Sequence, residues 1–168
     1  AINPGRCRIT VPMRKRKGSK GAVFIVLTHR LKGINIKKRN KYWLTPPEIY
    51  ESLDDEFDFD FDPCPYPWDG IDSTEIEWGE NTYCNPPFRK SDGEHGKGPT
   101  AFIRKAIEEN KKGKTVVVMI NTMSFINMLI EAGAEMRSMG RVKWLDAESG
   151  EPWPTPSCTT CFILKGNK

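Results

Sequence analysis

Hydrophobic residues recur along the chain in patterns that predict alternating strands and helices. The continuous apolar run over 115–120 predicts a strand that is buried on both faces. Phenylalanines alternate with acids over 57–62, which predicts a strand with one apolar face, and 81–84 predicts a short strand. Apolar residues spaced three and four apart predict a helix that begins at Ala101 and ends at Gly113.

Two further helices are predicted from their boundary residues. Thr45 is expected to be the N-cap of the first, with Pro46 in its first turn and Glu48 completing a capping box. This helix should run to Phe57, about three turns. Another helix is expected over 124–132, directly before a glycine.

The remaining segments complete an α/β pattern. Residues 141–145 and 159–164 predict an antiparallel strand pair at the sheet edge, whereas 64–79 and 89–100 are polar or rich in Pro and Gly and predict loops. Strands that alternate with helices predict a three-layer α/β domain with a mostly parallel sheet and an antiparallel edge pair. In such sheets, ligands bind beyond the carboxyl ends of the strands.

Charge is distributed unevenly along the chain. Of 26 Lys and Arg residues, 13 lie in 1–41, which contains no Asp or Glu; 42–168 holds the other 13 and all 22 acids, a net charge of −9. We therefore divide the chain into a basic N-terminal arm, 1–41, with a strand expected at 22–28, and one domain, 42–168. The arm is expected to contact nucleic-acid phosphates, although a solubilising or import-signal tail is the alternative. The residues expected to do so are Arg14, Lys15, Arg16, Lys17, Lys37, Lys38 and Arg39.

The cysteines and the apolar runs indicate the class of protein. The five cysteines have no disulfide-framework spacing, so we expect reduced thiols. Cys158 and Cys161 form a C-x-x-C, but no second pair completes a zinc site and no metal is expected. Because no run is long enough to cross a bilayer and no leader is visible, we expect a soluble, cytoplasmic protein without membrane contact.

The sequence Asn85-Pro86-Pro87-Phe88 directly follows the predicted strand 81–84. An adenine amino group is a weak nucleophile, and two acceptors aimed at it would favour its attack on a methyl donor. The Asn85 side chain and the Pro86 carbonyl could be these acceptors, held by consecutive prolines, while Phe88 offers a stacking face to an extruded base. The alternative interpretation is a rigid turn.

An ordered series of short motifs surrounds this tetrapeptide. It comprises Tyr-Trp-Leu-Thr-Pro-Pro-Glu at 42–48, Phe-Asp-Phe-Asp-Pro-Cys at 59–64, Trp78, Tyr-Cys-Asn-Pro-Pro-Phe at 83–88, Phe102 with Lys105 and Ala106, and Gly-Arg-Val-Lys-Trp at 140–144. The series, which extends to about Leu164, resembles the phage-type DNA N6-adenine methyltransferases. This resemblance implies a Rossmann-like fold, S-adenosylmethionine as cofactor, DNA as partner and, for a phage-encoded protein, the host-cell cytoplasm.

The resemblance also implies roles for particular residues. Catalysis is expected from Asn85, Pro86, Pro87 and Phe88; many relatives have Tyr in place of this Phe. Cofactor contacts are expected from Trp43, Thr45, Pro46, Asp62, Pro63, Cys64 and Asn85, although the usual glycine-rich loop is replaced by 63–70, which is rich in proline. Further DNA contacts are expected from Arg89, Lys90, Arg141 and Lys143.

Two alternatives stay open at this point. The Asn-Pro-Pro-aromatic motif also resembles that of RNA-adenine and protein-glutamine methyltransferases, and the basic arm favours a nucleic acid without separating DNA from RNA. A protein of another class, in which the arm binds nucleic acid and the domain is a catalytically silent scaffold, would have no affinity for S-adenosylmethionine.

Overall fold

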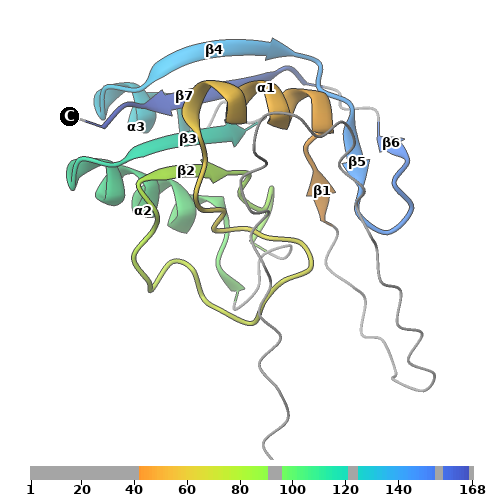
Figure 1. The fold of residues 1–168 in the computed structure, drawn as a ribbon, viewed down its shortest axis with the longest axis horizontal. Helices are drawn as coiled ribbons and strands as arrows, with labels where there is room; N and C mark the ends of the chain where they lie inside the picture. The colour runs from red at the N-terminus through yellow and green to blue at the C-terminus, as the bar shows by residue number, and fades with distance from the viewer. Residues whose placement is uncertain (1–41, 91–95, 121–124, 154–156, 167–168) are drawn as a thin grey trace, which may run out of the picture. The chain divides into compact units, whose positions relative to one another are not determined.

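The computed structural model describes residues 42–90, 96–120, 125–153 and 157–166 (Figure 1). The arm, its expected strand at 22–28 and its basic residues lie outside the described segments, so the division at residue 41 stays a prediction. No helix within those segments has the length and apolar character needed to cross a membrane.

The described segments form two sheets and three helices. The larger sheet has the order β2-β3-β7-β4, and the smaller has the order β1-β5-β6. The strands are β1 (Trp43–Leu44), β2 (Asn81–Cys84), β3 (Thr115–Ile120), β4 (Glu135–Gly140), β5 (Trp144–Asp146), β6 (Pro152–Trp153) and β7 (Thr159–Leu164). The helices are α1 (Pro47–Phe57), α2 (Pro99–Lys111) and α3 (Ile126–Glu131).

The larger sheet is mixed, so the prediction of a mostly parallel sheet is only partly met. Strands β2 and β3 are parallel, whereas β7 pairs antiparallel with both β3 and β4. The segment 159–164 is therefore an interior strand, and its partners are not the ones predicted. Segment 141–145 instead contributes to β5, which pairs with β1 and β6. The edge strand β4 was not predicted because half of its residues are exposed, the others are only half-buried, and they show no apolar alternation.

The two faces of β3 pack against different layers, as its apolar run predicted. Val117 and Met119 point to a core that includes Leu53 of α1 and Trp144 of β5. Val116, Val118 and Ile120 point to the opposite core, which includes Phe102, Ile103 and Ala106 of α2 and Leu129 of α3. Since side chains alternate along a strand, the sheet lies between two layers, with α1 on one side and α2 and α3 on the other (Figure 1).

Two predictions for residues 45–62 were wrong in detail. Helix α1 ends at Phe57 as expected, but its N-cap is Pro46, without a side-chain capping bond, because the Thr45 hydroxyl is hydrogen-bonded to Tyr83. The segment 57–62 is not a strand, since Asp58 is left-handed (φ 51°) and reverses the chain after α1. Phe59 joins the α1-side core, whereas Phe61 packs into the other core and its residue forms only an isolated parallel bridge to Thr82.

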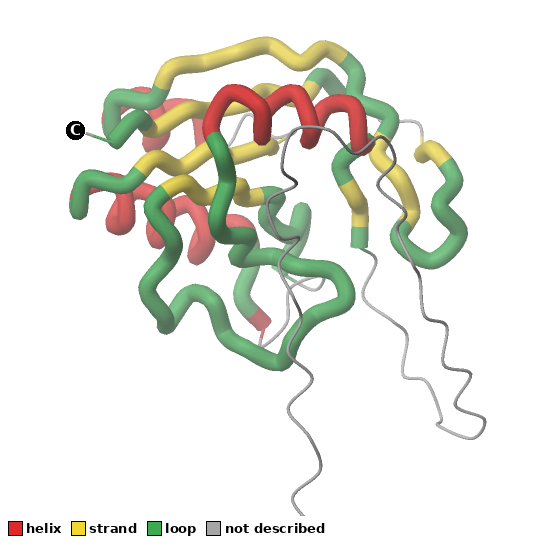
Figure 2. Tube along the Cα trace, in the orientation of Figure 1, coloured by secondary structure: helices red, strands yellow, loops and turns green. Residues whose placement is uncertain are grey.

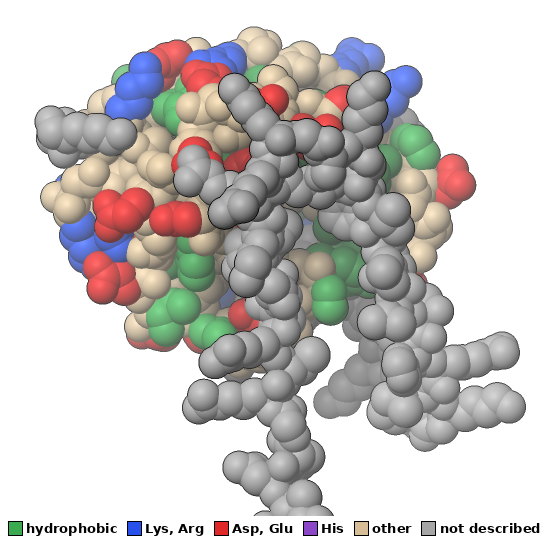
Figure 3. Space-filling view, viewed as in Figure 1, with side chains coloured by type: hydrophobic (Ala, Val, Ile, Leu, Met, Phe, Trp, Pro, Cys, Tyr) green, Lys and Arg blue, Asp and Glu red, His purple; other side chains and the backbone are tan. Residues whose placement is uncertain are grey.

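The helices and the loop between α1 and β2 agree better with the sequence. Helix α2 begins two residues before the expected Ala101, and α3 is shorter than 124–132. The expected loop 64–79 has no regular structure and runs below the larger sheet (Figure 2). It exposes Tyr66, Trp68, Ile71 and Ile76, and apolar atoms are visible along the lower edge of the same view (Figure 3).

A buried ion network joins α2 to the start of β3. The Glu109 side chain is fully buried and accepts from the ammonium groups of Lys105, Lys112 and Lys114 at 2.9, 2.7 and 2.8 Å. Its second carboxylate oxygen also accepts from the Trp78 amide at 3.3 Å. Burial alone would raise the pKa of Glu109, but these hydrogen bonds outweigh it and lower the pKa to about 2. The network therefore fixes one end of α2 against the loop and the sheet.

Glu109→Gln should destabilise the fold by about 3 kcal/mol or more at neutral pH, because it removes a buried anion that three lysines share. A lowered pKa means that the Glu109 carboxylate contributes fully above its ordinary value and loses its contribution as the pH falls toward about 2. The stability difference between wild type and variant should thus shrink in acid. Urea unfolding at about pH 7 and about pH 3 measures it.

Glu108→Gln is the matched control. Glu108 lies beside Glu109 on α2, contacts Lys105 and Lys112, and is exposed. It should lose much less stability than Glu109→Gln, since the surrounding water screens its ion pairs. Equal losses in the two variants would contradict the assigned importance of the buried carboxylate.

Candidate active site at the carboxyl end of β2

The Asn85 side chain is held in one orientation directly after β2. Its Nδ2 donates to the Trp43 carbonyl at 2.8 Å, which connects the end of β2 to β1. Its Oδ1 is buried and has no hydrogen-bond partner among the described residues. A buried acceptor without a donor is costly in a folded protein and marks a place where a ligand donor would bind. Asn85 therefore presents one oriented, unused oxygen.

The aromatic ring of Phe88 lies close to this asparagine in sequence and packs against the small sheet. Its ring meets the fully buried Trp144 ring edge-on, with centroids 5.4 Å apart and an interplanar angle of 75°. Phe88 itself is only half-buried and also lines a cavity. It can therefore offer a ring surface to a ligand while Trp144 supports it from behind.

Two tyrosines that were not assigned a role from the sequence, Tyr50 of α1 and Tyr83 of β2, pack against each other where the helix meets the sheet. The Tyr83 hydroxyl is hydrogen-bonded to the Thr45 hydroxyl, and the Tyr83 ring packs edge-on against Tyr50, with centroids 5.0 Å apart. Burial raises the pKa of Tyr83 well above its ordinary value, and burial with the charges of Asp54 and Asp62 raises the pKa of Tyr50 to about 12. Both tyrosines therefore stay protonated hydrogen-bonding groups near neutral pH.

The residues that follow Phe61 lie beside the end of β2. Phe61 bridges to Thr82, and the Asp62 carboxylate accepts the Cys64 amide at 2.8 Å. Burial, together with the negative charge of Asp69, raises the pKa of Asp62 to about 6. The pKa of Cys64 is raised well above its ordinary value, mainly by burial and to a smaller extent by the neighbouring Cys84 thiol. Since Cys84 precedes Asn85, the motifs at 59–64 and 83–88 are brought to one edge of the sheet.

The structure thus brings together most of the residues expected to contact a cofactor. Trp43 and Thr45 are linked by hydrogen bonds to Asn85 and Tyr83, while Asp62 lies near Tyr83 and Cys64 lies near Cys84. Pro46, Pro63 and Pro86 are buried, and Pro87 is half-buried. The arrangement places a carboxylate, hydroxyls and aromatic rings near one oriented amide, and the cofactor-binding and catalytic roles stay predictions.

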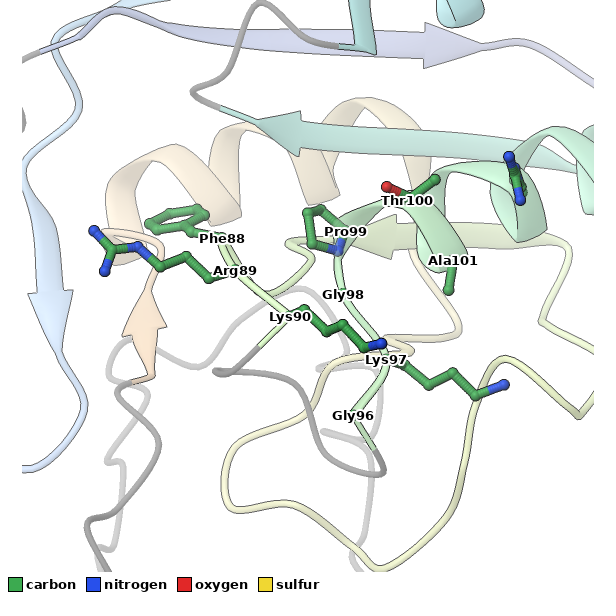
Figure 4. A pocket seen from close by; sticks show the side chains of 10 residues that line it. Phe88, Arg89, Lys90, Gly96, Lys97, Gly98, Pro99, Thr100 and Ala101 are labelled. Carbon is green, nitrogen blue, oxygen red and sulfur yellow. The ribbon is translucent and has the colours of Figure 1, made fainter.

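A cavity of about 530 Å³ opens at the start of α2 (Figure 4). It is lined by Phe88, Arg89, Lys90, Gly96, Lys97, Gly98, Pro99, Thr100, Ala101 and Arg104. Arg89 and Lys90 were expected to contact nucleic acid; Lys97 and Arg104 were missed. Lys97 lies in a segment that was predicted only as a loop, and Arg104 reads as an ordinary charged residue on the polar face of a helix. Only the folded chain shows that these four cations surround one space.

The other predicted nucleic-acid residues are not part of this cavity. Arg141 and Lys143 are exposed in the connection between β4 and β5, and neither lines the cavity. The C-x-x-C cysteines are separated by burial, since Cys161 lies in the core and Cys158 is exposed. Within the described segments, no group of three or more His, Cys, Asp and Glu residues is placed to hold a metal ion.

Comparisons with models of known protein families, with curated proteins and with solved structures found no match to this chain.

Asp62→Asn should stabilise the protein near neutral pH by on the order of 1–2 kcal/mol. The raised pKa, about 6, means that folded Asp62 holds its proton in a range where the unfolded chain has released it. Stability therefore falls as the pH rises from about 4 to about 6, and the variant escapes this loss. Urea unfolding at about pH 7.5 and about pH 3.5 should show a gain that disappears in acid.

Asp60→Asn gives the opposite expectation. The Asp60 carboxylate accepts the backbone amides of Glu80 and Asn81, both at 3.0 Å, where the chain enters β2. Weakening these bonds should destabilise the protein by about 1 kcal/mol near neutral pH. If Asp62→Asn is destabilising to the same degree there, the Asp62 carboxylate is a structural cap and not a strained binding group.

Proposed function

We propose that this chain is an S-adenosylmethionine-dependent methyltransferase that acts on the exocyclic N6 amino group of adenine in DNA. The observation that carries the proposal is the Asn85 Oδ1 atom, which is buried, oriented and without a hydrogen-bond partner among the described residues, three positions before the half-buried Phe88 ring. An oriented acceptor beside a stacking surface suits the recognition of a planar base that carries an amino group.

Asn85 would act by accepting a hydrogen bond from the target amino group. Its Nδ2 is already committed to the Trp43 carbonyl, so the side-chain amide cannot rotate without losing that bond. Drawing one N–H toward Oδ1, and the other toward the Pro86 carbonyl, would favour a more tetrahedral nitrogen whose lone pair can react. An acceptor that is already oriented costs no reorganisation during the reaction. The released proton would pass to water.

Phe88 would hold the extruded base in place. The Trp144 ring supports it edge-on, so that a base stacked on its free surface would lie against a fixed wall. Stacking on an aromatic side chain contributes about 1–3 kcal/mol per base and does not depend on a polar group. The phenylalanine therefore supplies what a tyrosine would supply here, except for the hydroxyl.

The residues around Asp62 fit S-adenosylmethionine, which would supply an electrophilic methyl group. The Asp62 carboxylate could bind the ammonium group or the ribose hydroxyls, and a cation would lower its raised pKa. Trp43, Thr45, Pro46, Pro63 and Cys64 would form the walls. The parallel β2–β3 pair and the parallel Phe61–Thr82 bridge, which end at this edge, support a Rossmann-like methyltransferase fold as part of the proposal.

Among the alternatives, the cavity favours a nucleic acid over a protein glutamine as acceptor. Four cations line it, and none of its described lining residues is acidic, as expected for contact with phosphates and not for a neutral side chain. An RNA adenine is the second candidate acceptor. Transfer of labelled methyl from S-adenosylmethionine to unmodified DNA and RNA tests both, and calorimetry with S-adenosylmethionine tests the silent scaffold, which would not bind it.

Asn85→Ala should abolish methyl transfer and leave S-adenosylmethionine affinity largely intact, because the lost acceptor acts mainly in the transition state and is worth several kcal/mol in comparable sites. Methyl-transfer rates and calorimetric titration on the same preparations measure the two effects. Asn127→Ala, at an exposed asparagine of α3, is the control and should keep wild-type rates. An Asn85→Ala enzyme that retains more than about a tenth of the wild-type turnover would falsify the proposed centre.

Phe88→Ala should lower catalytic efficiency about ten- to a hundredfold through the loss of stacking, whereas Phe88→Tyr and Phe88→Trp should keep substantial activity. A purely structural Phe88 makes a different forecast, a stability loss of roughly 3–5 kcal/mol on truncation. Melting temperature and methylation rate should be measured together on all three variants. A large stability loss with a normal rate per folded molecule argues against the stacking role.

A further inference from the structure

The cavity at the start of α2 is lined by four cations, and three of them have no acidic partner in the described segments. Lys97 pairs with Glu75 at 2.9 Å and lies 3.9 Å from Asp72. Arg89, Lys90 and Arg104 are exposed, and no acidic side chain in the described segments lies within ion-pair distance of any of the three. Like charges gathered around one space repel each other unless an anion joins them. The cavity thus has the charge of an anion site.

The backbone around the cavity brings the cations together. A Cβ atom on Gly98 would lie 2.9 Å from the Lys90 Cα, so only glycine allows the two ends of the 90–98 segment to approach this closely. The side chains of Lys90 and Lys97 extend in the same direction from the two ends of this segment, whereas Arg89 extends past Phe88 in the other direction (Figure 4). Gly98 is also the N-cap of α2, a helix of 13 residues without a side-chain cap, so the positive end of its dipole adds to the field.

We propose that this cavity seats a backbone phosphodiester of the nucleic acid, next to the nucleotide whose base enters the site. The inference rests on the proposed function and specifies how the substrate is held. Phe88 lines the cavity and belongs to the same four-residue segment as Asn85, so a base stacked on Phe88 has its sugar and phosphate directed toward the cations. A volume of about 530 Å³ exceeds that of a lone phosphate and leaves room for the attached sugar.

The same geometry explains why a phosphodiester is favoured over other anions. Its two non-bridging oxygens can accept from several separate donors at once, and Arg104 can supply paired N–H groups while Lys90 supplies a point charge. The contact would position the strand without reading its sequence, which suits an enzyme whose target base is recognised elsewhere, at Asn85 and Phe88.

Arg104→Ala tests the proposal, and Lys111→Ala is the matched control. Both side chains are exposed cations on α2, Arg104 near its middle and Lys111 at its C-terminal end, and only Arg104 lines the cavity. Binding of a fluorescent oligodeoxynucleotide with one adenine, followed by anisotropy at several salt concentrations, should give a salt slope about 0.9 smaller for Arg104→Ala than for wild type. Its affinity at about 0.1 M salt should fall about five- to tenfold, and Lys111→Ala should match wild type.

A modified substrate locates the contact on the nucleic acid. Neutral methylphosphonate linkages on either side of the adenine should weaken binding by wild type and by Lys111→Ala to a similar degree. They should have little further effect on Arg104→Ala, since the lost charge pair has already been removed. This coupling between one side chain and one phosphate is specific to a direct contact.

Three results would overturn the proposal: an unchanged slope in Arg104→Ala, equal sensitivity of all three proteins to methylphosphonates, or wild-type competition by polyglutamate as effective as by DNA. These binding assays are independent of turnover. If wild type binds the oligonucleotide with the expected slope but transfers no methyl group, the phosphate site stands and the proposed reaction fails. If methyl transfer occurs and Arg104→Ala binds as wild type does, the reaction stands and the site fails.

Discussion

Strand β3 is buried along both faces and both edges, and this constraint determines where the other elements must lie. Its backbone groups are paired with β2 on one side and β7 on the other, as buried polar groups require. Its side chains need two apolar layers, which α1 with Trp144 and α2 with α3 provide. Because β2 runs parallel to β3, its carboxyl end and Asn85 are placed at one defined edge of the sheet.

The site lies where this framework leaves polar groups incompletely satisfied. The Glu109 carboxylate, which has no role in the candidate site, accepts hydrogen bonds from three lysines and one backbone amide. In contrast, Asn85 Oδ1 has no partner in the described segments and burial raises the pKa of Asp62. Both features cost stability in the free protein. A ligand that donates a hydrogen bond to Asn85 Oδ1 would remove the first cost, and a cation beside Asp62 would remove the second. This contrast is what we expect between the proposed binding site and a structural network.

The sequence predicted elements whose pattern reflects their own burial, and it failed where distant residues decide the outcome. The run 115–120 and the apolar face of α2 are visible locally, so β3 and α2 were confirmed. Phe59 and Phe61 alternate as a strand with one apolar face would, yet in the folded chain they pack into opposite cores. The sequence around Thr45 predicts that it is an N-cap, but its hydroxyl is hydrogen-bonded instead to Tyr83, 38 residues away. Likewise, nothing local indicates that Arg104 shares a cavity with Lys90.

Charge distribution suggests that, in the proposed function, the cavity also orients the nucleic acid. Residues 42–168 carry a net charge of −9, so a polyanion approaching this part of the chain meets repulsion on average. The cavity is an exception, because Arg89, Lys90 and Arg104 line it without an acidic partner in the described segments, beside Lys97, which pairs with Glu75. Attraction confined to one place on an acidic domain guides a strand to that place, since wrong orientations bring phosphates near carboxylates. For the proposed nucleic-acid substrate, productive approach would therefore begin at the start of α2, beside Phe88.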